Sequence, residues 1–422
     1  MALNNMKERG AESVNMVSGA NFVILTLTIF TAFLIFGLSE NVKGPAIPSI
    51  QSDFGIDEFQ VGLLLAINAF GYLIACGYTA PLAAKSGLRP TLAVSLIGMA
   101  LSGIGICLSP GFLPLALSFF VMYLGNGMLE ITLGLMAATI FTKNTGAMLN
   151  ISHFFYGLGS MIGPVLSARL MAATMENTTL GWRYMYLIIL SFALIPLILG
   201  LIGRMAERSG DRQKLRITAF LKKPWVWPII LGLSLSYVCE MGIGGWLVNF
   251  LEKAYAFESG DAAFILAAFF ACFTAARLIL GPLTDKVGFT RSMLIATSFS
   301  GLAIIIGVAA GRPGIALLII AGIGVAPIYP TMLAIVAKLF ADDIYTAMTV
   351  ILTVLGIISM ISNLMLGGIV DGARHIFTQY YGEAGVGIAY SAGIMFLGLC
   401  CLVAFAATLV LYRELKRDGK MV

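Results

Sequence analysis

The amino-acid sequence predicts an all-helical (all-α) membrane protein, with twelve transmembrane helices in two pseudo-symmetric bundles of six. Three observations predict this fold class. Of the 422 residues, 59% are hydrophobic and only 11% are charged, against about 25% charged in an average soluble domain. The apolar residues fall in runs as long as the roughly 20 residues that cross a bilayer. The two halves of the chain also resemble each other in sequence.

So low a charged fraction cannot cover the surface of a soluble protein of this size. The composition therefore excludes a water-soluble enzyme, a nucleic-acid-binding module and a disordered scaffold. We expect the partners to be the lipid bilayer and a small molecule, with no nucleic acid.

Twelve apolar runs are candidates for the membrane-spanning helices. In chain order they cover residues 21–48, 58–83, 90–109, 112–141, 146–174, 184–203, 225–251, 262–283, 291–311, 314–340, 344–371 and 385–412. The one long polar stretch follows the sixth run. It divides the chain into an N-terminal bundle (1–203), a cytoplasmic linker (204–224) and a C-terminal bundle (225–422).

The basic residues predict the orientation of these helices. With the N-terminus placed in the cytoplasm, nineteen of the 26 Lys and Arg residues fall on the cytoplasmic side and four on the outer side. The positive-inside rule therefore places both termini in the cytoplasm. The short loops and tails are typical of a multi-pass protein of the bacterial cell membrane.

The two halves share a sequence repeat. Residues 70–90 align with residues 270–291, so that Pro81 meets Pro282 and Lys85 meets Lys286. Two similar halves of six helices favour a transporter over a channel or a receptor.

Three acidic residues lie well inside the apolar runs: Glu40, Glu130 and Glu240. A charged carboxylate near the middle of a bilayer costs about 2.5–3.5 kcal/mol. Each acid must therefore face a wet cavity, pair with a cation or carry a proton. We interpret all three as candidates for proton or cation coupling along the path of a hydrophilic solute.

Glu130 lies in the middle of the fourth run, and its partner in the repeat is Pro327. We expect Glu130 to bind the solute or to load a proton on one side of the membrane and release it on the other. The alternative is a structural carboxyl group with satisfied hydrogen bonds.

Glu240 precedes three closely spaced glycines in the segment 240–249, EMGIGGWLVN. Glycine weakens a helix, so we expect an unwound segment that lines the cavity. Trp246 can then stack on a sugar ring, with Asn249 beside it. The alternative is a close helix crossing with a packed Trp246.

Further polar residues complete the candidate site. Asn150, His153 and Tyr156 recur at helical spacing and form one polar stripe, and Asn363 in the eleventh run is another candidate. Histidine can also take part in proton coupling.

Two basic residues inside the runs need anionic partners. Lys43 can pair with Glu40 three residues away, as a local ion pair or gate, although Glu40 can equally contact the solute. For Arg277, both Glu240 and Glu40 are candidate partners.

The segment 281–291, GPLTDKVGFTR, resembles the signature loop of the major facilitator superfamily, G-x-x-x-D-x-x-G-x-x-R. The number of runs, the linker and the repeat extend the resemblance over the whole chain. It implies the major facilitator fold. It also implies that Asp285 and Arg291 form a conformational latch between the two halves at the cytoplasmic surface.

Three segments are similar to the fucose:proton symporter group and its sodium-dependent glucose transporter branch. They are G-x-G-x-x-E ending at Glu130, E-x-G-x-G-G-W from Glu240 to Trp246, and N-x-x-H-x-x-x-G-x-G beginning at Asn150. The resemblance implies a sugar-binding role for Glu130, with His153 nearby.

We therefore predict a monomeric, cation-coupled symporter that imports a small polar solute, a monosaccharide, by alternating access. We expect H⁺ rather than Na⁺ as the coupling ion. The six cysteines match no metal site and no catalytic motif is present, so we expect no metal, no cofactor and no enzyme activity. The alternative is a proton-coupled efflux pump for amphiphilic drugs or lipids. A membrane-bound sensor or enzyme is a second alternative, less favoured than the efflux pump.

Overall fold

The structure, a computed structural model, describes residues 19–141, 145–175, 178–179, 181–204, 217–340 and 344–420. Within these ranges the fold is helical except for one antiparallel pair of two-residue strands. The first half contains α2 (Ala20–Asn41), α3 (Lys43–Phe54), α4 (Glu58–Ser86), α5 (Leu88–Cys107), α6 (Phe112–Ile140), α7 (Thr145–Ala172), β1 (Thr174–Met175), β2 (Thr178–Thr179), α8 (Gly181–Ser191) and α9 (Leu194–Ile202). The second half contains α10 (Ile217–Leu221), α11 (Val226–Tyr255), α12 (Ser259–Val287), α13 (Phe289–Ala309), the 3₁₀ helix η1 (Arg312–Gly314), α14 (Ile315–Val325), α15 (Ile328–Leu339), α16 (Ile344–Tyr381) and α17 (Ala384–Arg417).

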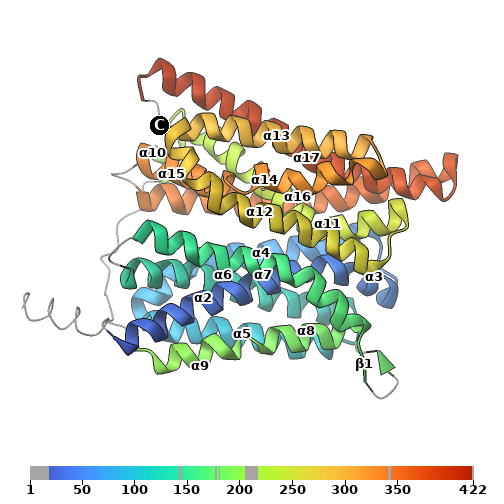
Figure 1. Ribbon diagram of the computed structural model, residues 1–422, viewed down its shortest axis with the longest axis horizontal. Coiled ribbons are helices and arrows are strands. Elements are labelled where there is room, and N and C mark those ends of the chain that lie inside the picture. The colour runs from blue at the N-terminus through green and yellow to red at the C-terminus, as the bar shows by residue number, and fades with distance from the viewer. Residues whose placement is uncertain are drawn as a thin grey trace, which may run out of the picture.

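The helices run side by side along the long axis of the molecule. Figure 1 shows the first-half helices, blue to green, in one layer and the second-half helices, yellow to red, in the other. Across the boundary α4 packs on α16, and α7 packs on α12. We call the end where α9 stops at Ile202 and α11 starts at Val226 the linker end, and the opposite end the distal end. α2 begins and α17 finishes at the linker end (Figure 1).

Eleven helical segments among the described residues are long and apolar enough to cross a membrane. They coincide with eleven of the predicted runs. The remaining run, 146–174, is helical as α7 and packs between α2 and α12, but it is not one of the eleven. Its serines and its histidine make it more polar than its neighbours. The structure thus confirms the all-helical membrane fold, while the count of twelve spans stays a prediction.

Prolines interrupt two of the spans next to the candidate site. Proline has no N–H to donate to the carbonyl four residues earlier, which kinks or breaks a helix. Pro45 leaves the carbonyl of Asn41 without this bond, and α2 gives way to α3 at Val42. Pro330 does the same for Ala326, and α14 gives way to α15. Both breaks place backbone and side-chain polar groups inside a span.

The unwound segment predicted at Gly242–Gly245 is wrong, because α11 is continuous from Val226 to Tyr255. The glycines serve close packing instead. A Cβ atom on Gly242 would lie 2.5 Å from Cδ2 of Leu397, and one on Gly44 would lie 2.6 Å from the carbonyl oxygen of Gly244. A helix inside a bilayer keeps its own hydrogen bonds where no other partner is at hand.

The core runs through both halves and the outside is apolar as well. Phe33 of α2 and Phe270 of α12 belong to one buried cluster. Large exposed side chains such as Leu113 and Ile279 cover the outer faces of the helices. This is the pattern of a helical bundle solvated by lipid, in which the informative positions are the buried polar ones.

Candidate functional site

Two adjoining cavities lie between the two halves. We call the first the amide cavity; it measures about 30 Å³ and is lined by Glu40, Lys43, Leu65, Asn68, Ala69, Tyr72, Tyr123, Tyr237, Met241, Leu355, Gly356, Ser359 and Asn363. We call the second the carboxylate cavity; it measures about 40 Å³ and is lined by Phe36, Glu40, Glu130, His153, Tyr156, Tyr237, Glu240, Met241, Arg277 and Tyr329. Glu40, Tyr237 and Met241 belong to both. All three predicted acids therefore face a cavity, and none faces lipid.

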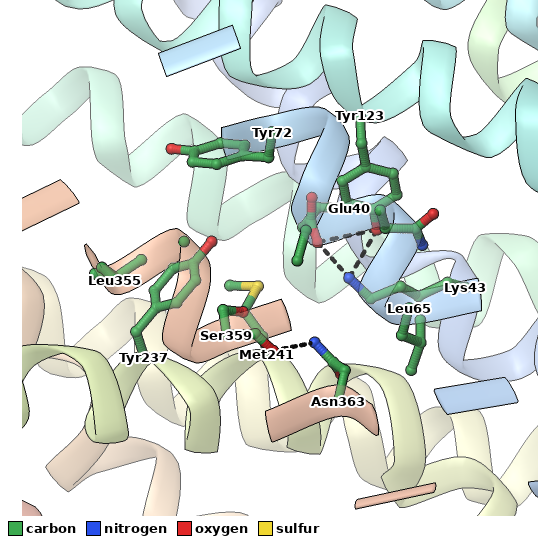
Figure 2. Close-up of a pocket in the computed structure, with 13 residues that line it drawn as sticks. Glu40, Lys43, Leu65, Tyr72, Tyr123, Tyr237, Met241, Leu355, Ser359 and Asn363 are labelled. Carbon is green, nitrogen blue, oxygen red and sulfur yellow. Dashed lines mark hydrogen bonds and ion pairs between the residues drawn. The ribbon is translucent and has the colours of Figure 1, made fainter. Parts of the chain in front are cut away.

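Glu40 and Lys43 form a buried ion pair, as their spacing predicts. Figure 2 shows this pair on the wall of the amide cavity opposite Tyr237, Met241 and Ser359. Lys43 Nζ also donates to the hydroxyl of Tyr123 at 2.8 Å, and this hydroxyl donates to Glu40 Oε1 at 3.1 Å. The spacing of three residues brings both charged side chains to the same side across the break between α2 and α3. The charge of Glu40 is thus matched within its own segment.

Glu240 is matched by a cation from another helix. Arg277 Nη2 of α12 lies 3.9 Å from Glu240 Oε1, which identifies Glu240 as its partner rather than Glu40. The Nε–H of Arg277 donates to the carbonyl oxygen of Ala326 at 3.3 Å. That carbonyl is the one that Pro330 leaves without a helical donor. The proline break of α14–α15 therefore holds Arg277 in the cavity wall.

Glu130 has a neutral partner. The hydroxyl of Tyr72 on α4 donates a hydrogen bond to Glu130 Oε2. Among the described residues, no basic side chain forms an ion pair with Glu130, whereas Glu40 and Glu240 each have one. The site thus holds three carboxyl groups and two permanent cations.

His153 and Tyr156, two members of the predicted polar stripe on α7, line the carboxylate cavity. The ring of His153 is 5.1 Å from that of Phe33, and the ring of Tyr156 is 5.0 Å from that of Phe36. These contacts fix α7 against α2 with both polar edges on the cavity. The side chain of Asn150 lies outside the described side chains.

Several polar contacts join the two halves at the distal end. Glu58 at the start of α4 accepts two hydrogen bonds of 2.8 Å from Arg374 of α16 and one of 3.0 Å from the hydroxyl of Tyr390 of α17. Nearby, Asn249 Nδ2 of α11 donates to Gln51 Oε1 of α3 at 2.6 Å. These contacts close the distal end between the halves.

The sequence model of the Major Facilitator Superfamily matches residues 29–258 and again 229–420, which together span almost the whole chain. The chain belongs to the major facilitator superfamily. The L-fucose-proton symporter of Escherichia coli is 21% identical to this transporter over 406 residues, which cover 85% of this chain and 89% of that protein.

Two solved structures resemble this major facilitator protein in fold. A bacterial homologue of the human lysosomal transporter Spinster, in an inward-facing and unoccupied conformation, superposes with a TM-score of 0.79 at 14% identity, over 94% of this chain and 99% of that chain. The D-xylose-proton symporter superposes with a TM-score of 0.74 at 15% identity, over 90% of this chain and 97% of that chain. The predicted family and multi-pass helical fold are confirmed.

The structure places some predicted residues of the transporter away from the cavities. Trp246 is 1% exposed, packs beside the ring of Tyr390 and lines neither cavity. Asn249 lies in the distal contacts described above. Of the predicted latch, Arg291 is exposed at the start of α13, and the side chain of Asp285 lies outside the described side chains. Asn363, by contrast, lines the amide cavity and donates to the carbonyl of Ser359 at 2.9 Å.

Sequence reasoning missed much of the wall of the major facilitator site. The residues it did not single out are tyrosines and an asparagine inside the spans: Asn68, Tyr72, Tyr123, Tyr237 and Tyr329. A search for hydroxyl and amide groups near the middle of each apolar run would have found them. Such a search would not have shown which of them meet.

Proposed function

We propose that this transporter is a proton-coupled symporter that moves a monosaccharide by alternating access. The observation that carries the proposal is the difference among the three acids that line the cavities. Glu40 and Glu240 have cationic partners, whereas the partner of Glu130 is a tyrosine hydroxyl. Glu130 is therefore the group at which one proton changes the charge balance of the site.

The charge balance gives the coupling its physical basis. With all three carboxyl groups ionised and both cations present, the site carries one net negative charge. A proton on Glu130 makes the loaded site neutral. Closing a neutral site off from water costs much less free energy than closing off a charged one. When proton and sugar are both bound, the transporter can therefore close the site on one side of the membrane and open it on the other.

The polar and aromatic wall suits a neutral sugar. Carboxylates accept hydrogen bonds from sugar hydroxyls, and the rings of His153, Tyr156 and Tyr329 offer flat apolar faces. Cavities of about 30 and 40 Å³ hold a few waters, so a sugar enters as the halves move apart. The relative that transports L-fucose with a proton supports the same class of solute and ion.

The sequence alternative, an efflux pump for amphiphilic compounds, would suit a larger cavity with an apolar lining. The ion pairs beside Glu130 favour a small hydrophilic solute instead. We further propose twelve spans in two six-helix halves, both termini in the cytoplasm of a bacterial cell, a monomer as the working unit, and Asp285 with Arg291 as the cytoplasmic latch.

Transport by Glu130→Gln in proteoliposomes tests the proposal. We would measure uptake of radiolabelled L-fucose, D-xylose and D-glucose with and without an inward proton gradient, and sugar exchange without a gradient. The expected result is loss of concentrative uptake with exchange retained. The exposed Glu258, changed to Gln, is the matched control and should behave as the unmodified protein. Accumulation of sugar by Glu130→Gln against a gradient would contradict the proton role.

A further inference from the structure

Asn68 of α4 is a buried side chain whose hydrogen-bonding groups are unused. It is 2% exposed and lines the amide cavity. Both its Nδ2 and its Oδ1 are buried without a hydrogen-bond partner in the described part of the chain. A buried amide that bonds to nothing is costly, and native proteins seldom keep one without a ligand or water to satisfy it.

Each of the other buried asparagines, Asn41, Asn126 and Asn249, makes at least one hydrogen bond, although Asn249 Oδ1 also lacks a partner among the described residues. Asn41 Nδ2 donates to the carbonyl of Gly37 and to Ser160, and Asn126 bonds to Ser39 and Glu40. Both amides tie first-half helices together. Asn68 makes no such tie, so packing alone gives no reason for an amide at this position.

Several other polar groups of the amide cavity are already engaged. Glu40, Lys43 and Tyr123 bond to one another (Figure 2). Asn363 donates to the carbonyl of Ser359. A ligand group in this cavity therefore meets the unused amide of Asn68, with an acceptor and two donor hydrogens, near the hydroxyls of Tyr237 and Ser359 and beside an ion pair of zero net charge.

We propose that the amide cavity is a second solute subsite, in which Asn68 binds two neighbouring hydroxyl groups of the sugar. One hydroxyl donates to Oδ1 and the next accepts from Nδ2. A charged group is disfavoured here because no unmatched counter-charge faces it. The inference rests on the proposed sugar transport, and it adds Asn68 as the residue that distinguishes sugars by the arrangement of their hydroxyl groups.

The proposed subsite in the amide cavity is connected to Glu130, the proposed proton site, through Tyr72. Tyr72 lines the amide cavity and donates to Glu130, which lines the carboxylate cavity. Tyr237 and Met241 line both cavities, and the methionine side chain is flexible. A pyranose that occupies both cavities would touch Asn68 at one end and lie beside Glu130 at the other.

The first test is discrimination among sugars by Asn68→Leu, a substitution of similar size. For the hexose that inhibits uptake most strongly, we would compare its affinity with those of its 2-, 3-, 4- and 6-deoxy analogues. In the unmodified protein at least one analogue should bind about 10- to 100-fold more weakly than the parent sugar. In Asn68→Leu that analogue should approach the parent to within about threefold. An equal loss for all sugars, or no change, would overturn the proposal.

Thermal melting of the same variant separates binding from a structural role. Leucine removes an unsatisfied amide, so Asn68→Leu should melt no lower than the unmodified protein in the absence of sugar. A strongly lowered melting temperature with unchanged discrimination would show that Asn68 is structural.

Thiol labelling tests the subsite without any sugar. With the six native cysteines replaced, Asn68→Cys should react with a hydrophilic methanethiosulfonate reagent in membranes. Leu64→Cys on the same helix, where the native side chain is 1% exposed and lines neither cavity, is the control and should stay unreactive. Equal reactivity of both positions would overturn the subsite. It would leave the proton role of Glu130 standing, because Glu130→Gln tests that role separately.

Discussion

Replacing Glu58 by Gln should open the distal end of the transporter. The carboxylate of Glu58 is 3% exposed and accepts three hydrogen bonds from the second half, two from Arg374 and one from Tyr390. Alternating access requires these bonds to break when the distal end opens. Both bonds from Arg374 come from its Nη1, and Gln cannot offer this nitrogen a charged carboxylate, so the closed state loses stability relative to the open one.

The size of the shift follows from the burial of the two partners. Removing one partner of a fully buried ion pair costs about 3–5 kcal/mol. The side chain of Arg374 is 46% exposed and regains water, so we expect about 1–2 kcal/mol here. Each 1.4 kcal/mol is a factor of ten, which gives a shift of roughly 5- to 30-fold toward the open distal end.

Electron paramagnetic resonance distances can measure this shift. Spin labels at Ser52 of α3 and Tyr380 of α16, both exposed and in different halves, report the separation of the distal ends. The ratio of long to short distances should rise roughly 5- to 30-fold in Glu58→Gln. Glu258→Gln is the control, since Glu258 is exposed at the start of α12 and forms no ion pair among the described residues. A distance distribution identical to that of the unmodified protein would refute the reasoning.

Three further substitutions probe the site and its supports. Tyr72→Phe removes the hydrogen bond that Tyr72 donates to the carboxylate of Glu130. Because this bond favours the ionised carboxylate, its loss should move the pH optimum of uptake to higher pH. An unchanged pH profile would show that the bond is unimportant to coupling. Lys43→Gln leaves Glu40 without a cation and should lower the free energy of unfolding, measured by chemical denaturation, by about 3–5 kcal/mol. The double variant Glu40→Gln/Lys43→Gln should recover part of this stability, and absence of recovery would argue against the ion pair. Gly37→Ala places a Cβ atom on a backbone carbonyl of α7 and should cost about 1–3 kcal/mol, seen as a lower melting temperature, whereas an unchanged temperature would mean that the crossing yields easily.

Local patterns were predictable from the sequence, and contacts between distant segments were not. The apolar runs follow from the hydropathy of the sequence alone. The pair Glu40–Lys43 follows from a spacing of three residues on a helix. The partner of Arg277 stayed open because its candidates lie on other helices, and only the packing of α11 against α12 decides for Glu240.

The errors have a physical origin as well. A glycine-rich segment such as Gly242–Gly245 is equally suited to unwinding and to close packing, and only the neighbouring helix shows which occurs. Glu58 at the start of a helix looks like an ordinary first-turn acid, because its partners are more than 300 positions away. Asn68 cannot be singled out from the sequence, because one amide in an apolar run is not unusual. Its lack of partners is visible only when the helices are assembled.

The proton on Glu130 is the central claim, and infrared difference spectroscopy tests it most directly. Addition of the transported sugar to membrane-embedded protein should change the carbonyl-stretch band of a protonated carboxylic acid. The band should be absent in Glu130→Gln and unchanged in the control Glu258→Gln. A sugar-induced carboxylic-acid band that persists in Glu130→Gln would place the proton on another group and contradict the account.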